Sequence, residues 1–136
     1  MSECIFCEIL ADRAPSHRVY EDAEVLAFMD AFPVAPGHTL IIPKRHAENL
    51  FEIGEACLAA VSRVSRRVAL GIQDALAPEG VMVMQLNGAA AGQTVFRYHT
   101  HLIPRSLGSS LSLHPRVPGN DEEIGALAAR ISRAVN

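Results

Sequence analysis

The stretch at residues 85–105 reads QLNGAAAGQTVFRYHTHLIPR, and it constrains the fold more than any other part of the chain. It starts within an apolar run at 81–86, passes through a loop of small residues at 87–92 and ends in a second extended segment at 98–103. Proline has no N–H to donate to a neighbouring strand, so we expect Pro104 to end this second segment. The pattern predicts two strands joined by a loop of small residues.

Alternation along the second strand predicts which side chains share a face. Successive side chains of a strand point to opposite faces, so Arg97, His99 and His101 line one face. The other face carries Tyr98, Thr100 and Leu102. Two imidazoles and a guanidinium beside a loop whose glycines let backbone N–H groups approach an anion indicate a phosphate site. The alternative is that these histidines are structural.

Apolar periodicity and turn signals predict the rest of the fold. In the first half of the chain, the expected elements are a short helix that opens at 4–7, a hairpin over 18–30 and a strand over 38–42 that Pro43 ends. After them we expect a long helix over about 56–76, a loop over 106–119 and a last helix capped by Asn120 or Asp121. Apolar steps of three and four indicate the two longer helices, and apolar runs between turn residues indicate the strands. This order favours an α+β fold with a largely antiparallel five-stranded sheet, a long central helix and a C-terminal helix.

Composition and charge narrow the functional classes. With 136 residues and a hydrophobic share of 49%, the chain suits one domain over residues 1–136. A net charge of −3 gives no electrostatic case for a nucleic-acid partner. No apolar run approaches the ~20 residues needed to span a bilayer, and MSECIFCEIL lacks the pattern of a signal peptide. Three cysteines suit a reducing compartment, so we expect a cytoplasmic protein with neither a membrane nor a nucleic-acid partner.

Two of the cysteines form a C-x-x-C pattern near the N-terminus. The spacing of Cys4 and Cys7 suits half of a zinc site or a redox pair. The alternative is a pair of small, partly buried side chains. The third cysteine, Cys57, falls in the long helix, where we expect a packing role.

Taken together, these motifs resemble the histidine triad (HIT) family of nucleotide hydrolases and transferases. The family signature is His-x-His-x-His preceded by a Gly-Gln-Ser/Thr loop, and the corresponding segment here is GQTVFRYHTHLIPR. Further matching segments are IFCEIL, VYEDAEVLAFMD, APGHTLIIPKRH and NGAAAGQTV, and together they run from Ile5 to Arg105. The resemblance implies an antiparallel sheet with a long helix, and a homodimer.

The resemblance also implies roles for individual residues. It makes His99 the nucleophile, gives His101 a contact with the phosphate and places His38 beside them. It assigns to substrate binding Gln93 and Thr94 near the phosphate or the leaving group, Asp30 at the ribose hydroxyls, and Ile5, Phe6, Ile9 and Phe28 around the base. Asn87, adjacent to Leu86 where the chain departs from the family pattern, is also counted among the expected substrate-binding residues. Alternation along the strand, by contrast, points Asn87 away from the phosphate.

The implied activity is cleavage of nucleoside phosphoramidates or dinucleoside polyphosphates at the α-phosphate, with a purine nucleotide as substrate. A neutral imidazole can attack the phosphorus and form a nucleotidyl-histidine intermediate, which water then hydrolyses without a required cofactor. The first alternative is a nucleotide-binding protein with weak or lost catalysis that acts as a sensor or interaction module. The second is a zinc-dependent structural or redox protein built on the C-x-x-C pattern.

Two positions depart from the family pattern. Arg97 stands where the family has its first histidine, which resembles the fourth ligand of a structural zinc in members with the C-x-x-C pattern. The other three ligands would be Cys4, Cys7 and His46. Structural zinc needs four N or S ligands and a guanidinium has no lone pair to give, so we expect no zinc unless water or another residue completes the set. Leu86 stands where relatives commonly carry Asn or Gln, and the lost hydrogen bond could cost roughly 1–3 kcal/mol of transition-state binding.

Overall fold

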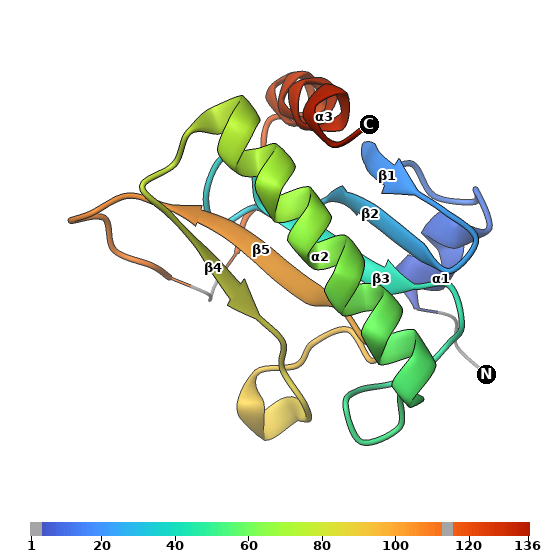
Figure 1. Ribbon diagram of the computed structural model, residues 1–136. Helices are drawn as coiled ribbons and strands as arrows, with labels where there is room; N and C mark the ends of the chain where they lie inside the picture. Colours follow the sequence, from blue (N-terminus) through green and yellow to red (C-terminus); the bar gives the residue numbers. More distant parts are fainter. Residues whose placement is uncertain (1–3, 113–115) are drawn as a thin grey trace.

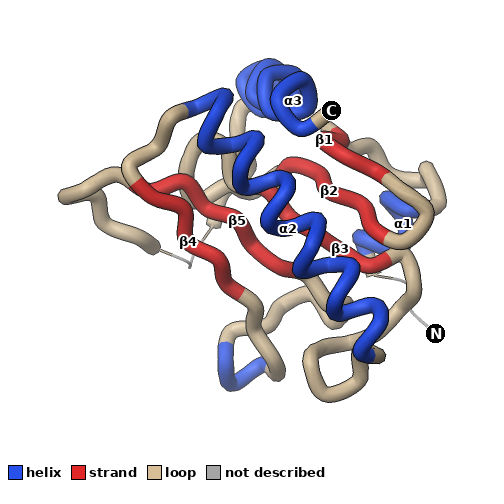
Figure 2. The backbone as a smooth tube through the Cα atoms, viewed as in Figure 1, coloured by secondary structure: helices blue, strands red, loops and turns tan. Residues whose placement is uncertain are grey.

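The structure is a computed structural model that describes residues 4–112 and 116–136, and a five-stranded sheet forms its centre (Figures 1 and 2). The elements in chain order are α1 (Ile5–Leu10), β1 (Arg18–Glu21), β2 (Val25–Met29), β3 (Thr39–Pro43), α2 (Glu55–Leu76), β4 (Gly80–Met84), η1 (Ala89–Ala91), β5 (Thr100–Arg105) and α3 (Asp121–Val135). The strands lie in the order β1-β2-β3-β5-β4, and every neighbouring pair is antiparallel. This arrangement confirms the expected α+β fold.

Alternation along the strands divides the core into two layers, one on each face of the sheet. The layer against α2 and α3 includes the strand residues Val25, Ala27, Met29, Ile41 and Leu102. The layer against α1 consists of Phe6, Ile9, Leu26, Phe28, Leu40 and Ile42. Figure 1 shows α2 crossing the front of the sheet, so the small helix α1 is left to cover part of the opposite face.

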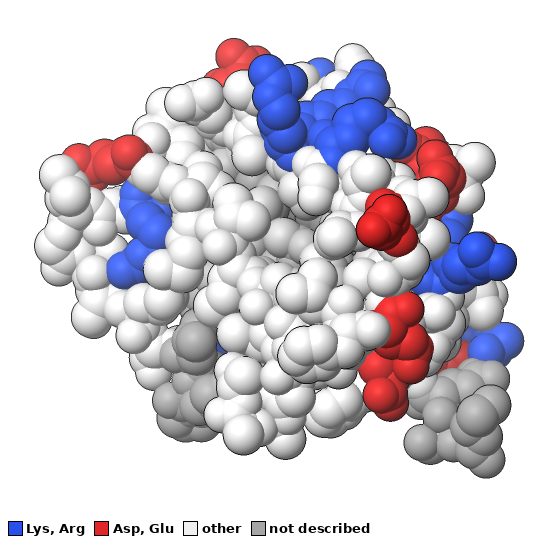
Figure 3. All heavy atoms as spheres, turned by 60° about the horizontal axis from the view of Figure 1, so that its bottom comes forward, with Lys and Arg blue, Asp and Glu red and all other residues white. Residues whose placement is uncertain are grey.

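The long central helix α2 follows the predicted pattern. Its buried side chains recur at steps of three and four, and they include Ala60, Val61, Val64, Val68 and Ile72. Arg63 on the opposite side is exposed, and Figure 3 shows basic side chains gathered over this side of the molecule. The helix ends at Leu76, because the capping residue Ala77 adopts a left-handed φ of 47° and Pro78 cannot continue the helix.

The last helix, α3, begins at one of the two expected caps. Asn120 accepts a hydrogen bond from the N–H of Glu123 at 2.9 Å through its side-chain oxygen. Three acidic residues occupy the first turn, where they complement the helix dipole. The helix packs closely on α2 at Gly71, because a Cβ at that position would collide with the side chain of Val135.

Two strand ends differ from the sequence-based expectation. Pro43 is the last residue of β3, and Pro104 lies inside β5, which continues to Arg105. β3 pairs with β5 only as far as Leu102, so Pro104 lies beyond this pairing and its missing N–H leaves no β3 carbonyl unsatisfied. The predicted strand at 98–103 is therefore shifted by two residues toward the C-terminus.

The loop expected over 106–119 contains no helix or strand in its described parts, 106–112 and 116–119. Residues 113–115 of that loop lie outside the described residues. None of the helices formed by the described residues is long and apolar enough to cross a membrane.

Candidate functional site

A pocket of about 610 Å³ opens on the face of the sheet that α1 covers, a size typical of small-molecule sites. Its apolar wall includes Ile5, Phe6, Ile9, Phe28 and Leu40. Its polar lining includes Asp30, Thr94, His99, His101 and Arg116. The structure thus brings together most of the residues that the resemblance assigned to the base, the ribose and the phosphate.

Strand pairing explains why the two histidines reach this pocket. His101 of β5 lies directly opposite Leu40 of β3, which in turn lies opposite Phe28 of β2. Directly opposed residues of antiparallel strands share a face, so these three side chains form one row. The ring of His99 lies 4.9 Å from that of His101 and 5.0 Å from that of Phe6, measured between centroids. The predicted shared face of the two histidines is confirmed.

One hydrogen bond fixes the tautomer of His99. Its Nδ1 lies 2.7 Å from the carbonyl oxygen of Arg97, and a carbonyl can only accept, so Nδ1 carries the proton. Nε2 therefore keeps its lone pair. Burial lowers the pKa of His99 below its ordinary value and outweighs the opposing effect of the Arg97 carbonyl. His99 is accordingly a neutral imidazole with one nucleophilic nitrogen.

A relay of hydrogen bonds fixes the tautomer of His101 in the opposite sense. The N–H of Val34 donates to Nδ1 of His38 at 3.1 Å, so the proton of this ring is on Nε2. Nε2 of His38 lies 2.9 Å from Nδ1 of His101 and donates to it. The remaining proton of His101 is therefore on Nε2. His101 can donate a hydrogen bond, whereas His99 can attack.

Burial keeps both members of this relay neutral. It lowers the pKa of His38 to about 4, although the nearby Asp30 carboxylate acts in the opposite direction. It lowers the pKa of His101 to about 3, helped by the neighbouring His99 and His38. At pH 7 the relay therefore consists of neutral rings with a defined direction of donation.

Asp30 follows the end of β2 and its carboxylate is buried. One oxygen accepts the N–H of Phe32 at 2.8 Å, and the other lies 2.9 Å from the guanidinium of Arg116. Sequence reasoning missed Arg116, because a single arginine in a loop rich in Ser, Gly and Pro carries no local signal. Only the tertiary fold places it over Asp30.

Three residues assigned to the phosphate region lie in different settings. Thr94 lines the pocket. Gln93 is buried and ties two loops together, because its side chain accepts from the N–H of Gly88 and donates to the carbonyl of Glu48, both at 2.7 Å. Asn87 accepts from the N–H of Leu50 at 2.7 Å and also pairs with Gln85. Neither Gln93 nor Asn87 lines the pocket, and their amide groups join the loop that follows β4 to residues 48–50.

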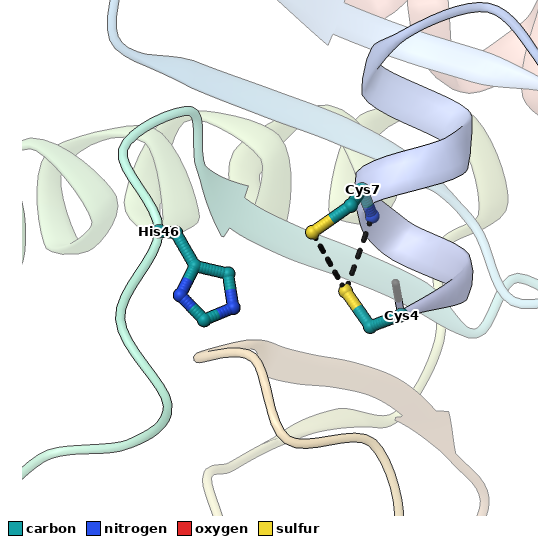
Figure 4. Close-up of side chains that lie close together, drawn as sticks. All are labelled: Cys4, Cys7 and His46. Atoms are coloured by element: carbon teal, nitrogen blue, oxygen red, sulfur yellow. Dashed lines mark hydrogen bonds between the residues drawn. The ribbon is translucent and has the colours of Figure 1, made fainter. Parts of the chain in front are cut away.

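A second cluster lies beside the first turn of α1 (Figure 4). Cys4, Cys7 and His46 each offer a ligand atom, and these atoms lie within 4.8 Å of one another. The Sγ atoms of the two cysteines are 2.9 Å apart. The guanidinium of Arg97 approaches the same cluster, with Nη1 at 3.1 Å from Sγ of Cys7. Arg97 thus points toward the residues expected around a family zinc.

These residues do not fit a structural zinc ion. Tetrahedral zinc takes four N or S ligands, and the described residues bring three together here. The fourth side chain in contact is the cation of Arg97, which has no lone pair to donate and repels Zn²⁺. The donor chemistry supports the sequence-based expectation that this arginine disfavours zinc.

Known proteins with similar sequences and structures share this architecture. A family model described as the HIT domain matches residues 11–107. Adenylylsulfatase HINT3 of Arabidopsis thaliana is 34% identical over 136 residues, which cover 97% of this chain and 69% of that protein. A HIT-like protein involved in cell-cycle regulation from Bartonella henselae, crystallised with an unknown ligand, is 39% identical with a TM-score of 0.92, covering 97% of this chain and 96% of that one. A Zn-bound histidine triad family protein from Mycobacterium smegmatis is 36% identical with a TM-score of 0.82, covering 96% of this chain and 94% of that one.

Proposed function

Because this chain belongs to the histidine triad family, we propose that it is a hydrolase or transferase that cleaves nucleoside phosphoramidates or dinucleoside polyphosphates at the α-phosphate. The proposed substrates are purine nucleotides. The observation that carries the proposal is the state of His99. This buried, neutral ring lines the pocket, and its bond to the carbonyl of Arg97 leaves the lone pair of Nε2 available.

In the first step, Nε2 of His99 attacks the α-phosphorus and the bond from phosphorus to the leaving group breaks. The ring of the resulting nucleotidyl-histidine is positively charged. The carbonyl of Arg97, already bonded to Nδ1–H at 2.7 Å, stabilises this charge. In the second step, water attacks the phosphorus, the bond to Nε2 breaks and the nucleoside monophosphate leaves.

His101 supplies a fixed hydrogen-bond donor for this chemistry. The relay from Val34 through His38 holds its proton on Nε2, where it can donate to a non-bridging oxygen of the α-phosphate. Phosphoryl transfer depends mainly on positioning and on stabilising charge at these oxygens. A donor whose tautomer is fixed before substrate binds needs no reorganisation in the transition state.

The opposite end of the pocket suits the nucleoside. A flat purine ring complements the apolar wall formed by Ile5, Phe6, Ile9 and Phe28. The buried carboxylate of Asp30 can accept hydrogen bonds from the ribose hydroxyls. Its Oδ2 is paired with Arg116 at 2.9 Å, so ribose binding requires Arg116 to move or to share this oxygen.

Leu86 favours the alternative of a nucleotide-binding protein with weak catalysis. An apolar side chain replaces an amide that relatives commonly place near the phosphate, and Leu cannot donate a hydrogen bond. The loss is roughly 1–3 kcal/mol of transition-state binding, or one to two orders of magnitude in rate. Such a change slows a histidine-dependent reaction without abolishing nucleotide binding.

Release of AMP from adenosine 5′-phosphoramidate tests the two functions. We expect turnover by the unmodified protein and a loss of roughly three or more orders of magnitude in His99→Ala, because the nucleophile is removed. AMP affinity, measured by calorimetry, should change only a few-fold in that variant. His46→Ala is the matched control, since His46 is exposed and outside the pocket, and it should retain full turnover. AMP binding without any AMP release by the unmodified protein would support the binding protein and reject the enzyme.

A further inference from the structure

Arg97 is a buried cation with few partners. Arg97 is only 2% exposed. Its Nη2 donates to the carbonyl oxygens of Pro43 at 2.6 Å and Lys44 at 2.8 Å. Nη1 contacts Sγ of Cys7 at 3.1 Å, and Nε has no partner among the described residues. A buried charge is costly unless an opposite charge compensates it. Of the three groups that Arg97 contacts in the described parts of the chain, only the sulfur of Cys7 can become an anion.

The two thiols differ in their surroundings. Sγ of Cys4 donates to Sγ of Cys7 at 2.9 Å, and the backbone N–H of Cys7 donates to Sγ of Cys4 at 3.2 Å. Burial opposes ionisation of both. At Cys7 the bonds from Cys4 and Arg97 outweigh burial and lower its pKa, whereas burial and the neighbouring Cys7 raise the pKa of Cys4. Ionisation is therefore favoured at Cys7, which contacts the guanidinium, over Cys4.

Charge balance explains how this cluster differs from a metal site. A divalent zinc would neutralise two thiolates, whereas the single charge of Arg97 can neutralise only one, at the sulfur of Cys7 that it contacts. A sulfur anion in contact with a neighbouring thiol is the arrangement required for thiol–disulfide exchange. Both cysteines are partly exposed, so a small reagent can reach them.

We propose that Cys7 and Cys4 form a reactive dithiol that low-molecular-weight disulfides oxidise reversibly to an intramolecular disulfide, with Arg97 as the group that activates Cys7. The Cys7 thiolate attacks the reagent's disulfide, forming a mixed disulfide and releasing one thiolate. That thiolate takes the proton of Cys4. The Cys4 sulfur then attacks the Cys7 sulfur, forming the Cys4–Cys7 bond and releasing the second reagent thiolate. Two cysteine thiols are oxidised and one reagent disulfide is reduced to two thiols.

The dithiol site adjoins the pocket through α1. α1 carries both Cys7 and Phe6, whose ring lies 5.0 Å from that of His99, and the backbone of Arg97 holds Nδ1 of His99. In the disulfide the sulfur of Cys7 can no longer carry a negative charge beside Arg97. Oxidation therefore changes the contact between α1 and the residues that lead into β5. The dithiol chemistry itself does not depend on the proposed nucleotide hydrolysis, and it can be tested on its own.

The test is peptide mapping after incubation of the reduced protein with oxidised glutathione at pH 7, followed by alkylation. We expect a Cys4–Cys7 disulfide that excess reduced glutathione reverses. Cys57 is partly exposed like the other two but lies in α2, outside this cluster, so it should remain a free thiol that is alkylated and serves as the internal control. Cys4→Ser should stop the reaction at a glutathionyl adduct on Cys7. Arg97→Met, which retains the length of the side chain but not its charge, should slow adduct formation at Cys7 several-fold, because the guanidinium that lowers the pKa of this thiol is lost.

Three results would overturn this inference. The first is a Cys7 that reacts no faster than Cys57 in the unmodified protein, a comparison that needs no variant. The second is a Cys4→Ser protein in which Cys7 forms no adduct. The third is stoichiometric zinc in protein purified without chelator, bound to Cys4 and Cys7 and blocking both thiols, which would show that this is a metal site after all.

Discussion

Lowering the pH from 7.5 to 5 should destabilise the fold through His38 and His101. Burial lowers the pKa of these rings from 6.5 to about 4 and about 3. Above pH 6.5 both rings are neutral in the folded and the unfolded chain, so their contribution to stability is constant. Below pH 6.5 only the unfolded chain takes up protons, and the free energy of unfolding falls as the pH falls.

The size of this decrease in the free energy of unfolding can be estimated at pH 5. In the unfolded chain each histidine has a pKa of 6.5, which is about 1.5 units above a solution pH of 5. Protonation of the unfolded chain therefore lowers the free energy of unfolding by about 2 kcal/mol for each ring. His38 and His101 are 0% and 4% exposed, so solvent screens little of this effect. The two rings together account for about 4 kcal/mol, a large part of the 5–15 kcal/mol that is typical of a domain.

Urea unfolding at a series of pH values between 7.5 and 5 measures this loss. The series stops at pH 5 because carboxylates such as Glu21, whose pKa is lowered mainly by its bond with Lys44, lose their stabilising contribution below it. His38→Gln removes one of the three buried rings whose pKa the fold lowers, His38, His99 and His101, and should reduce the pH dependence. Equal unfolding free energies at pH 7.5 and 5 would refute the neutral, directional relay.

Three further predictions concern the ribose, the metal and the oligomer. Asp30→Ala should abolish a preference for ribonucleotides over deoxyribonucleotides in competition binding, and an unchanged preference would show that Asp30 does not hold the ribose. Arg97→His should restore a fourth ligand, raise zinc affinity sharply and raise the Tm in zinc, as metal analysis and thermal unfolding of both proteins purified without chelator would show. The unmodified protein should run as a homodimer in light scattering at micromolar concentration, because β4 is an edge strand and exposes Val83 (61%); a mass of 14.7 kDa would contradict this.

Local periodicity was sufficient to predict the elements that position the site. The two-residue repeat placed His99 and His101 on one face, and the steps of three and four located α2 within one residue of its observed start. Both signals depend on neighbours in the chain, which is why sequence alone carries them. The catalytic and binding roles of these residues stay predictions.

Features that depend on tertiary contacts could not be read from the sequence. The relay needs β3 and β5 to pair so that His38 meets His101, residues 63 positions apart. Gln93 was assigned to substrate, but its amide donates to the carbonyl of Glu48, 45 positions away, which only the fold brings near. The position of Pro104 inside β5 depends on where β3 happens to start. Each case is decided by a partner distant in sequence, which no local pattern encodes.

The central claim is that His99 carries the nucleotide between two displacements. The stereochemical course at the α-phosphorus tests this claim most directly. The substrate would be an adenosine phosphoramidate made chiral at the α-phosphorus with sulfur and oxygen isotopes, cleaved by the unmodified protein. Each in-line displacement inverts the phosphorus. Attack by His99 followed by attack by water should therefore give net retention. Net inversion would contradict the account, because it would mean that water attacks the phosphorus directly and that no nucleotidyl-histidine forms.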